Sequence, residues 1–177
     1  MAVKTCLVGT GPVCGRCIDI IQKHKDDFLR HFGVDIELAR VCSLSPAEAE
    51  AHGVGHLFTD NFNNIINDPE IDIVVELIGG TTIAKDIVLK AIENGKHVGT
   101  ANKKLIAEYG NDIFALAQEK GVTVAFEAAV AGGIPISKAL REGLTANKIE
   151  WVAGIINGTS NFILTEMRGK GLAFDDV

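Results

Sequence analysis

The sequence predicts an α/β fold, a doubly wound parallel sheet, followed by the beginning of an α+β domain. Three observations support this. A short apolar run at the N-terminus ends in a Gly-x-Gly turn, and apolar runs then alternate with amphipathic stretches at least four times. The apolar runs are nearly continuous, as in strands that helices cover on both faces. The 177 residues suffice for one full domain and part of a second.

Strands are expected where short apolar runs end in glycine or polar turns. In chain order they cover residues 3–8, 36–42, 71–77, 97–100 and 122–126. The third run is apolar apart from Asp72 and Glu76 and ends in Gly79-Gly80.

Helices are expected where apolar residues recur at steps of three and four. They cover residues 12–32, 63–67, 84–94 and 104–120. Gly33, Gly95 and Gly121 follow the long helices and are expected to end them. A further short helix is expected to begin with Ser45 as its N-cap and Pro46 as its first residue.

The pattern changes near Pro135, so we expect one domain over residues 1–134 and a second over 135–177. The second begins with a helix over 136–144, a strand over 149–156, and a helix over 160–168 capped by Thr159. No later strand follows for that strand to pair with. We therefore interpret 135–177 as the start of a second domain whose remainder is absent.

Composition excludes several function classes. The net charge is −6, the pI is near 5.3, and no basic stripe is present, which argues against nucleic-acid and anionic-membrane partners. No apolar stretch approaches the length of about 18 residues that a membrane span needs. The N-terminus lacks a signal-peptide pattern, so a cytoplasmic location is expected.

The four cysteines include the C-x-x-C formed by Cys14 and Cys17. Three interpretations compete: a redox pair, half of a zinc site, and small buried residues at the start of a helix. Cys6 and Cys42 lie in apolar strands, where they are poorly placed to complete a zinc site. We favour buried packing.

The turn after the first strand is typical of a Rossmann-type dinucleotide site. In G-x-G-x-x-G, the first glycine makes the turn, the second lets the pyrophosphate approach the backbone, and the third lets helix and strand pack closely. Here small Cys14 stands at the third position, with Gly15 next. The pyrophosphate is expected on Gly9, Thr10, Gly11, Pro12, Val13 and Cys14, at a helix N-terminus. The alternative is a glycine turn that binds nothing.

The residues at the end of the second strand do not distinguish NAD from NADP. An acidic residue there would hold the ribose 2′-OH of NAD, but the chain has Ser43-Leu44-Ser45, and Arg40 lies inside the strand.

Five sequence blocks together, in order and spacing, resemble those of homoserine dehydrogenases. They are DIVVELIGG (72–80), TANKKLIA (100–107), FEAAVAGGIPI (126–136), LREGL (140–144) and GIINGTSNFIL (154–164). Ala129 stands where the family usually has serine. The resemblance implies an oxidoreductase that interconverts aspartate semialdehyde and homoserine with NAD or NADP, in threonine and methionine biosynthesis, as a homodimer. It also implies that residues 135–177 begin the substrate and dimerisation domain of such an enzyme.

The resemblance also implies site residues. Those beside the cofactor correspond to Ile78, Gly79, Gly80, Thr100, Asn102 and Lys103. The charge of Lys103 would stabilise the developing alkoxide and orient the substrate; from spacing alone it is equally a solvated loop lysine. A monovalent cation such as Na⁺ would bind backbone carbonyls at positions that correspond to Glu127, Val130, Gly132 and Ile134. The alternative for that segment is a plain linker between domains.

The family's proton-transfer lysine and substrate-binding acids lie beyond residue 177. Since oxidation of an alcohol needs a base, we expect this chain to bind cofactor without turnover. A rival is a standalone NAD(P)-binding or sensing module. A second rival is a semialdehyde dehydrogenase, which needs a nucleophilic cysteine. Cys14 and Cys17 are poorly placed to supply it. The five histidines are interpreted as structural or surface residues.

Overall fold

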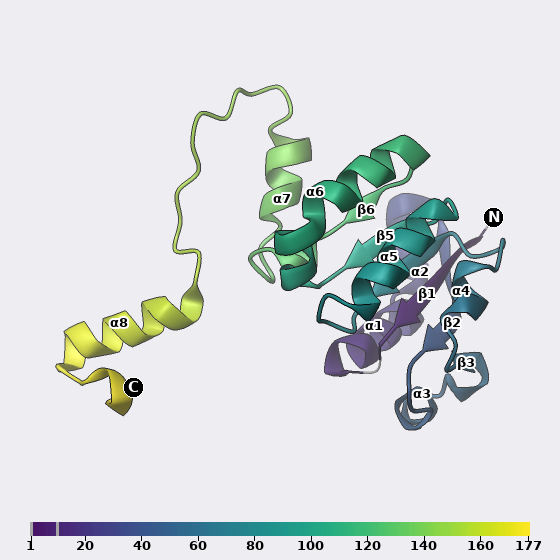
Figure 1. Ribbon diagram of the computed structural model, residues 1–177, viewed down its shortest axis with the longest axis horizontal. Helices are drawn as coiled ribbons and strands as arrows, with labels where there is room; N and C mark the ends of the chain where they lie inside the picture. The colour runs from purple at the N-terminus through teal and green to yellow at the C-terminus, as the bar shows by residue number, and fades with distance from the viewer. Residues whose placement is uncertain (1, 10) are drawn as a thin grey trace. The chain divides into compact units, whose positions relative to one another are not determined.

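A computed structural model describes residues 2–9 and 11–177 and divides the chain into two compact units, Met1–Pro135 and Ile136–Val177 (Figure 1). In the first unit, the described residues form one parallel sheet in the order β3-β2-β1-β4-β5-β6. Its strands are β1 (Ala2–Val8), β2 (Asp35–Cys42), β3 (Phe58–Thr59), β4 (Ile73–Glu76), β5 (His97–Thr100) and β6 (Val124–Ala125). This strand order is that of the Rossmann fold, so the predicted α/β class is confirmed.

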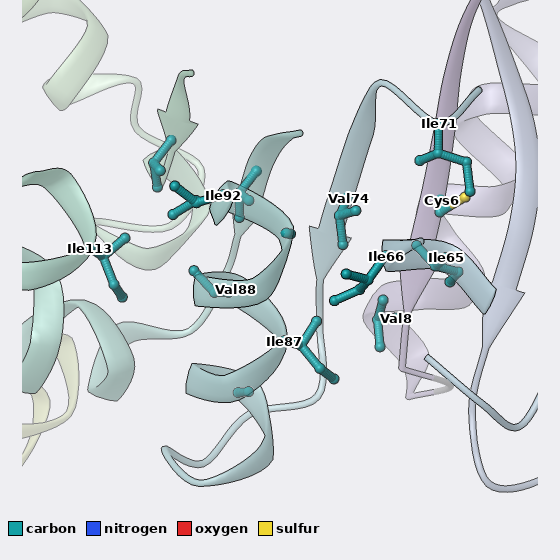
Figure 2. Packing of buried hydrophobic residues seen from close by; sticks show 14 of the residues in the cluster. Cys6, Val8, Ile65, Ile66, Ile71, Val74, Ile87, Val88, Ile92 and Ile113 are labelled. Carbon is teal, nitrogen blue, oxygen red and sulfur yellow. The ribbon is translucent and has the colours of Figure 1, made fainter. Parts of the chain in front are cut away.

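Helices cover both faces of the sheet. They are α1 (Pro12–Lys23), α2 (Lys25–Phe32), α3 (Ala47–Ala51), α4 (Asn63–Ile66), α5 (Ile83–Glu93) and α6 (Lys103–Lys120). Alternation along the strands sends neighbouring side chains to opposite faces. In β1, Cys6 and Val8 join one apolar cluster with α4, α5 and α6, while Leu7 joins another with α1 and α3. Figure 2 shows side chains from β1, β4, α4, α5 and α6 gathered in the first cluster.

Three local expectations for this unit need correction. The helix expected over 12–32 is two helices that meet at His24, where ψ is 20° and the side chain contacts Asp27 at 3.0 Å. Apolar periodicity continues across one non-helical residue, so it does not reveal the break. The two-residue strand β3 is too short to stand out as an apolar run. Pro46 occupies the cap of α3, one residue later than expected for Ser45, whose Oγ still accepts from Ala47 N at 3.4 Å.

Glycines end the long helices as predicted. Gly33 follows α2 at φ +69° and Gly121 follows α6 at φ +68°, both in the left-handed conformation that favours glycine. Gly95, just beyond α5, has φ +73°.

The second unit is mostly helical and irregular. It contains α7 (Ile136–Lys138), a π-helical turn (Ala139–Gly143), α8 (Gly158–Lys170) and a 3₁₀ turn (Phe174–Asp176). The strand expected over 149–156 is wrong, because the described part of this unit offers no second strand to share its hydrogen bonds; Trp151 is 77% exposed. The cap of α8 is Asn157, whose Oδ1 accepts from Ser160 N at 2.8 Å, and not Thr159.

Candidate functional site

The turn after β1 is held tightly between the ends of β2 and β4. Gly9 N donates to Cys42 O at 2.8 Å. Gly9 has φ +127°, and a Cβ built on it would lie 2.8 Å from Leu77 O. Only glycine fits here without moving backbone, which agrees with its expected role as the turn residue. Thr10, also expected in the phosphate loop, lies outside the described residues.

The next part of the loop is open. Gly11 is the N-cap of α1 with an ordinary φ of −71°, and a Cβ built on it meets no heavy atom within 4 Å. Pro12 is the first residue of the helix, no side chain caps it, and its first turn holds no acidic residue. Pro12 and Val13 are exposed. A helix N-terminus of this kind offers N–H groups and a positive dipole end to an anion.

The third position of the loop faces the core. Cys14 is 1% exposed and belongs to the cluster with Leu7, Ile18 and Val41. The closest approach falls one residue later, at Gly15, because a Cβ there would collide with the imidazole of His52. The small side chain at 14 and the missing one at 15 thus both let α1 lie close to its neighbours.

Burial suppresses thiol chemistry at the C-x-x-C. It raises the pKa of Cys14 from 9.0 to about 12, and it raises the pKa of Cys17 as well. Reactive cysteines have a lowered pKa, so this environment disfavours a redox pair. Within the residues that the structure describes, no group of three or more His, Cys, Asp or Glu side chains is arranged to hold a metal ion.

We predict that Cys14 resists alkylation in the folded chain. A pKa raised from 9.0 to about 12 leaves about a thousandfold less thiolate near pH 8 than an ordinary cysteine has. Iodoacetamide labelling followed by peptide mass spectrometry should show Cys14 modified slowly in buffer and rapidly in urea. Equal rates in both, or ready formation of a Cys14–Cys17 disulfide under mild oxidation, would contradict the buried, inert thiol.

A second group of predicted residues gathers where β4 and β5 end. Glu76 and Thr100 are register partners at these ends, and both are buried. Glu76 Oε1 accepts from Ile78 N at 2.8 Å and Gly79 N at 3.0 Å, and Oε2 accepts from the Thr100 hydroxyl at 2.6 Å. No role was expected for Glu76 from the sequence. The available signal was a carboxylate in an apolar strand, three residues before Gly79.

Asn102 joins the two loops. Its Nδ2 donates to Gly80 O at 2.6 Å, and its Oδ1 caps α6 by accepting from Leu105 N at 3.0 Å. Asn102 N in turn donates to Thr100 Oγ1 at 3.0 Å. Ile78, Gly79 and Gly80 are exposed, so their backbone is accessible at the sheet edge where parallel α/β proteins bind ligands.

Lys103 is the first residue of α6 and is exposed. A cation at a helix N-terminus opposes the helix dipole, so helix stability does not explain a lysine there. Its position beside Asn102 places it at the same sheet edge as Gly80. A lysine there is available to an anionic or developing negative charge on a ligand.

The segment expected to hold a cation has irregular backbone. Glu127–Ala129 is a 3₁₀ turn in which Glu127 O accepts from Val130 N at 3.2 Å. Ala131 has φ +47°, unusual for a residue with a side chain, and its carbonyl accepts from Ile134 N at 2.9 Å. Gly132 and Ile134 are exposed. The Glu127 carbonyl thus already accepts a hydrogen bond within the turn.

The described helices include none long and apolar enough to cross a membrane.

Comparisons with known proteins match both parts of the chain. The family model described as the NAD binding domain of homoserine dehydrogenase matches residues 9–127, and the model described as homoserine dehydrogenase matches residues 135–177. Homoserine dehydrogenase of Pseudomonas aeruginosa is 56% identical over 175 residues, covering 99% of this chain and 40% of the relative. That of Bacillus subtilis is 38% identical over 177 residues, covering 99% of this chain and 41% of the relative.

Solved structures similar to this chain are also homoserine dehydrogenases. A homoserine dehydrogenase from Thiobacillus denitrificans has a TM-score of 0.91 at 57% identity, covering 99% of this chain and 41% of its own. A hyperthermophilic archaeal homoserine dehydrogenase in complex with NADPH has a TM-score of 0.80 at 26% identity, covering 99% and 59%. The chain thus spans about two fifths of the length of the bacterial relatives. It belongs to the homoserine dehydrogenase family.

Proposed function

We propose that this chain is the cofactor-binding part of an NAD(P)-dependent homoserine dehydrogenase. The whole protein would interconvert aspartate semialdehyde and homoserine in threonine and methionine biosynthesis, as a cytoplasmic homodimer. The observation that carries the proposal is the open backbone at Gly11, at the N-terminus of α1, beside the point where the strand order reverses between β1 and β4. The match to an NAD binding domain over residues 9–127 supports it.

Each group of site residues has a separate proposed role. Gly9 to Cys14 would hold the pyrophosphate, and the backbone of Ile78, Gly79 and Gly80 would lie along the cofactor, which supplies or accepts the hydride when bound. Thr100 and Asn102 would keep that backbone in place through the hydrogen bonds to Glu76 and Gly80. The charge of Lys103 would orient the substrate and stabilise the alkoxide oxygen.

The residues at the end of β2 do not distinguish NAD from NADP. Ser43 and Ser45 follow this strand, and Ser43 Oγ donates to Ser45 O at 2.7 Å. Because no carboxylate stands at residues 43–45, a 2′-phosphate is not repelled there. NADP and NAD therefore both enter the proposal.

A monovalent cation such as Na⁺ is the remaining proposed ligand, on the carbonyls of Glu127, Val130, Gly132 and Ile134. The irregular backbone around Ala131 supports it, since such backbone can turn several carbonyls toward one ion.

Titration of the 177-residue chain with NADPH and NADH tests the proposal. We expect nicotinamide fluorescence to rise and saturate, with a Kd below about 1 mM, which is the upper end of the KM values common among enzymes. We also expect no homoserine-dependent formation of reduced cofactor at 340 nm, since the chain supplies no assigned base.

Two results would contradict the proposal. Absence of saturation with both cofactors would remove the binding function. Steady homoserine oxidation by this chain would show that it already contains the proton-transfer residues. Cofactor binding by a longer protein that spans the relatives' full length, with no homoserine turnover, would favour a sensing module.

A further inference from the structure

A buried carboxylate lies at the centre of the candidate site. Glu76 ends β4, the strand that pairs with both β1 and β5, and it is 0% exposed. Burying a carboxylate is costly unless hydrogen bonds replace its water. An apolar side chain of similar volume would fill the same space without that cost. Packing alone therefore does not explain a glutamate at this position.

The hydrogen bonds of Glu76 close a ring between two loops. One carboxylate oxygen accepts from the amides of Ile78 and Gly79, and the other accepts from the Thr100 hydroxyl. From Thr100 the ring continues through Asn102 N and returns from Asn102 Nδ2 to Gly80 O. Each link is 3.0 Å or shorter, so the ends of β4 and β5 are tied into one unit.

The same loop forms a wall of the phosphate turn. Leu77 N donates to Val8 O at 2.8 Å, next to Gly9. The Leu77 carbonyl is the atom that a Cβ on Gly9 would meet at 2.8 Å. A shift in the backbone directly after Glu76 would therefore move the surface against which the Gly9 turn rests.

We propose that Glu76 is a positioning residue for the dinucleotide. It acts through the backbone of residues 77–80 and through Thr100, and it fixes both loops before the cofactor arrives. Binding then avoids the entropy cost of ordering them. This inference rests on the proposed function, because it assumes that the dinucleotide lies along these loops.

Glu76→Gln tests the inference with almost no change in shape. A glutamine amide places an N–H₂ group where one carboxylate oxygen accepts, so at least one donor of the ring loses its acceptor. We expect the Kd for NADPH to rise about tenfold, measured well below the Tm of the variant. Thr100→Val should also raise the Kd for NADPH. Thr100→Ser, which keeps the hydroxyl, should have the Kd of the original chain.

Lys96→Met is the matched control. Lys96 is 3% exposed and donates to Ile71 O at 2.9 Å, and it precedes β5 whereas Thr100 ends it. Removing its ammonium breaks a buried hydrogen bond at the opposite end of the same strand. We expect a lower Tm with an unchanged Kd for NADPH, which separates positioning from general stability.

The outcomes are distinct. An unchanged Kd in folded Glu76→Gln would overturn the inference and leave the proposed function standing. If Glu76→Gln does not fold, the Thr100 pair decides, and equal affinity of Thr100→Val and the original chain would overturn it. A chain that binds neither NADPH nor NADH would overturn both proposals together.

Discussion

Replacing Gly11 with valine is expected to abolish NADPH binding while changing the free energy of unfolding by no more than about 1 kcal/mol. Gly11 has φ −71°, which any residue adopts, and a Cβ there meets nothing within 4 Å. A branched side chain would therefore be accommodated by the fold, yet it would occupy the space in front of α1 that the pyrophosphate needs. Fluorescence titration and urea unfolding of the same preparation measure both effects.

Gly169→Val provides the control for this substitution. Gly169 is also open to 4 Å and lies in α8 of the second unit, outside the candidate site. It should bind NADPH like the original chain. If Gly11→Val retained its affinity for NADPH, the phosphates would not approach this backbone, even though the fold is of the Rossmann type.

Replacing Gly9 with alanine should instead destabilise the fold, by about 3 kcal/mol. Two costs combine: a side chain at φ +127°, and a Cβ 2.8 Å from the Leu77 carbonyl. Backbone strain of this kind and overpacking each cost about 1–3 kcal/mol. The clash involves main chain on both sides, so no rotamer change relieves it. Urea unfolding followed by circular dichroism gives the free-energy difference.

Gly95→Ala separates the two costs. Gly95 also has a left-handed φ, +73°, but a Cβ on it meets nothing within 4 Å. It should cost only about 1 kcal/mol, the strain alone. If Gly9→Ala costs no more than Gly95→Ala, the close approach to Leu77 is absent in solution.

Much of the first unit was predictable because its signals are local. Apart from the two-residue β3, the strands of the sheet overlap the apolar runs that predicted them. Gly33 and Gly121 mark helix ends through a backbone conformation that other residues avoid. The break at His24 was not, because one changed ψ leaves the apolar stripe intact. Residues 149–156 have the apolar character of a strand, but a strand needs a neighbour, and local sequence does not report whether one is available.

In the candidate site too, local features were predictable and features that depend on distant partners were not. Gly9 was predicted to make the turn from its place in the motif, and its φ is +127°. Glu76 was passed over because its value depends on partners up to 24 residues away, such as Thr100. A composition pattern shows a carboxylate in a strand but not the donors that surround it. Cofactor contacts at the predicted residues remain predictions until titration.

Asn102 carries two duties that cannot be adjusted separately. Its oxygen starts an 18-residue helix, and its nitrogen restrains the carbonyl of Gly80. Aspartate would retain the first duty and lose the second, since an ionised carboxylate cannot donate. If the cofactor lies along Gly80 as proposed, position 102 is pleiotropic: one substitution alters a folding trait and a ligand trait together. Mutational paths that tune cofactor use without touching the stability of α6 must therefore run through other positions.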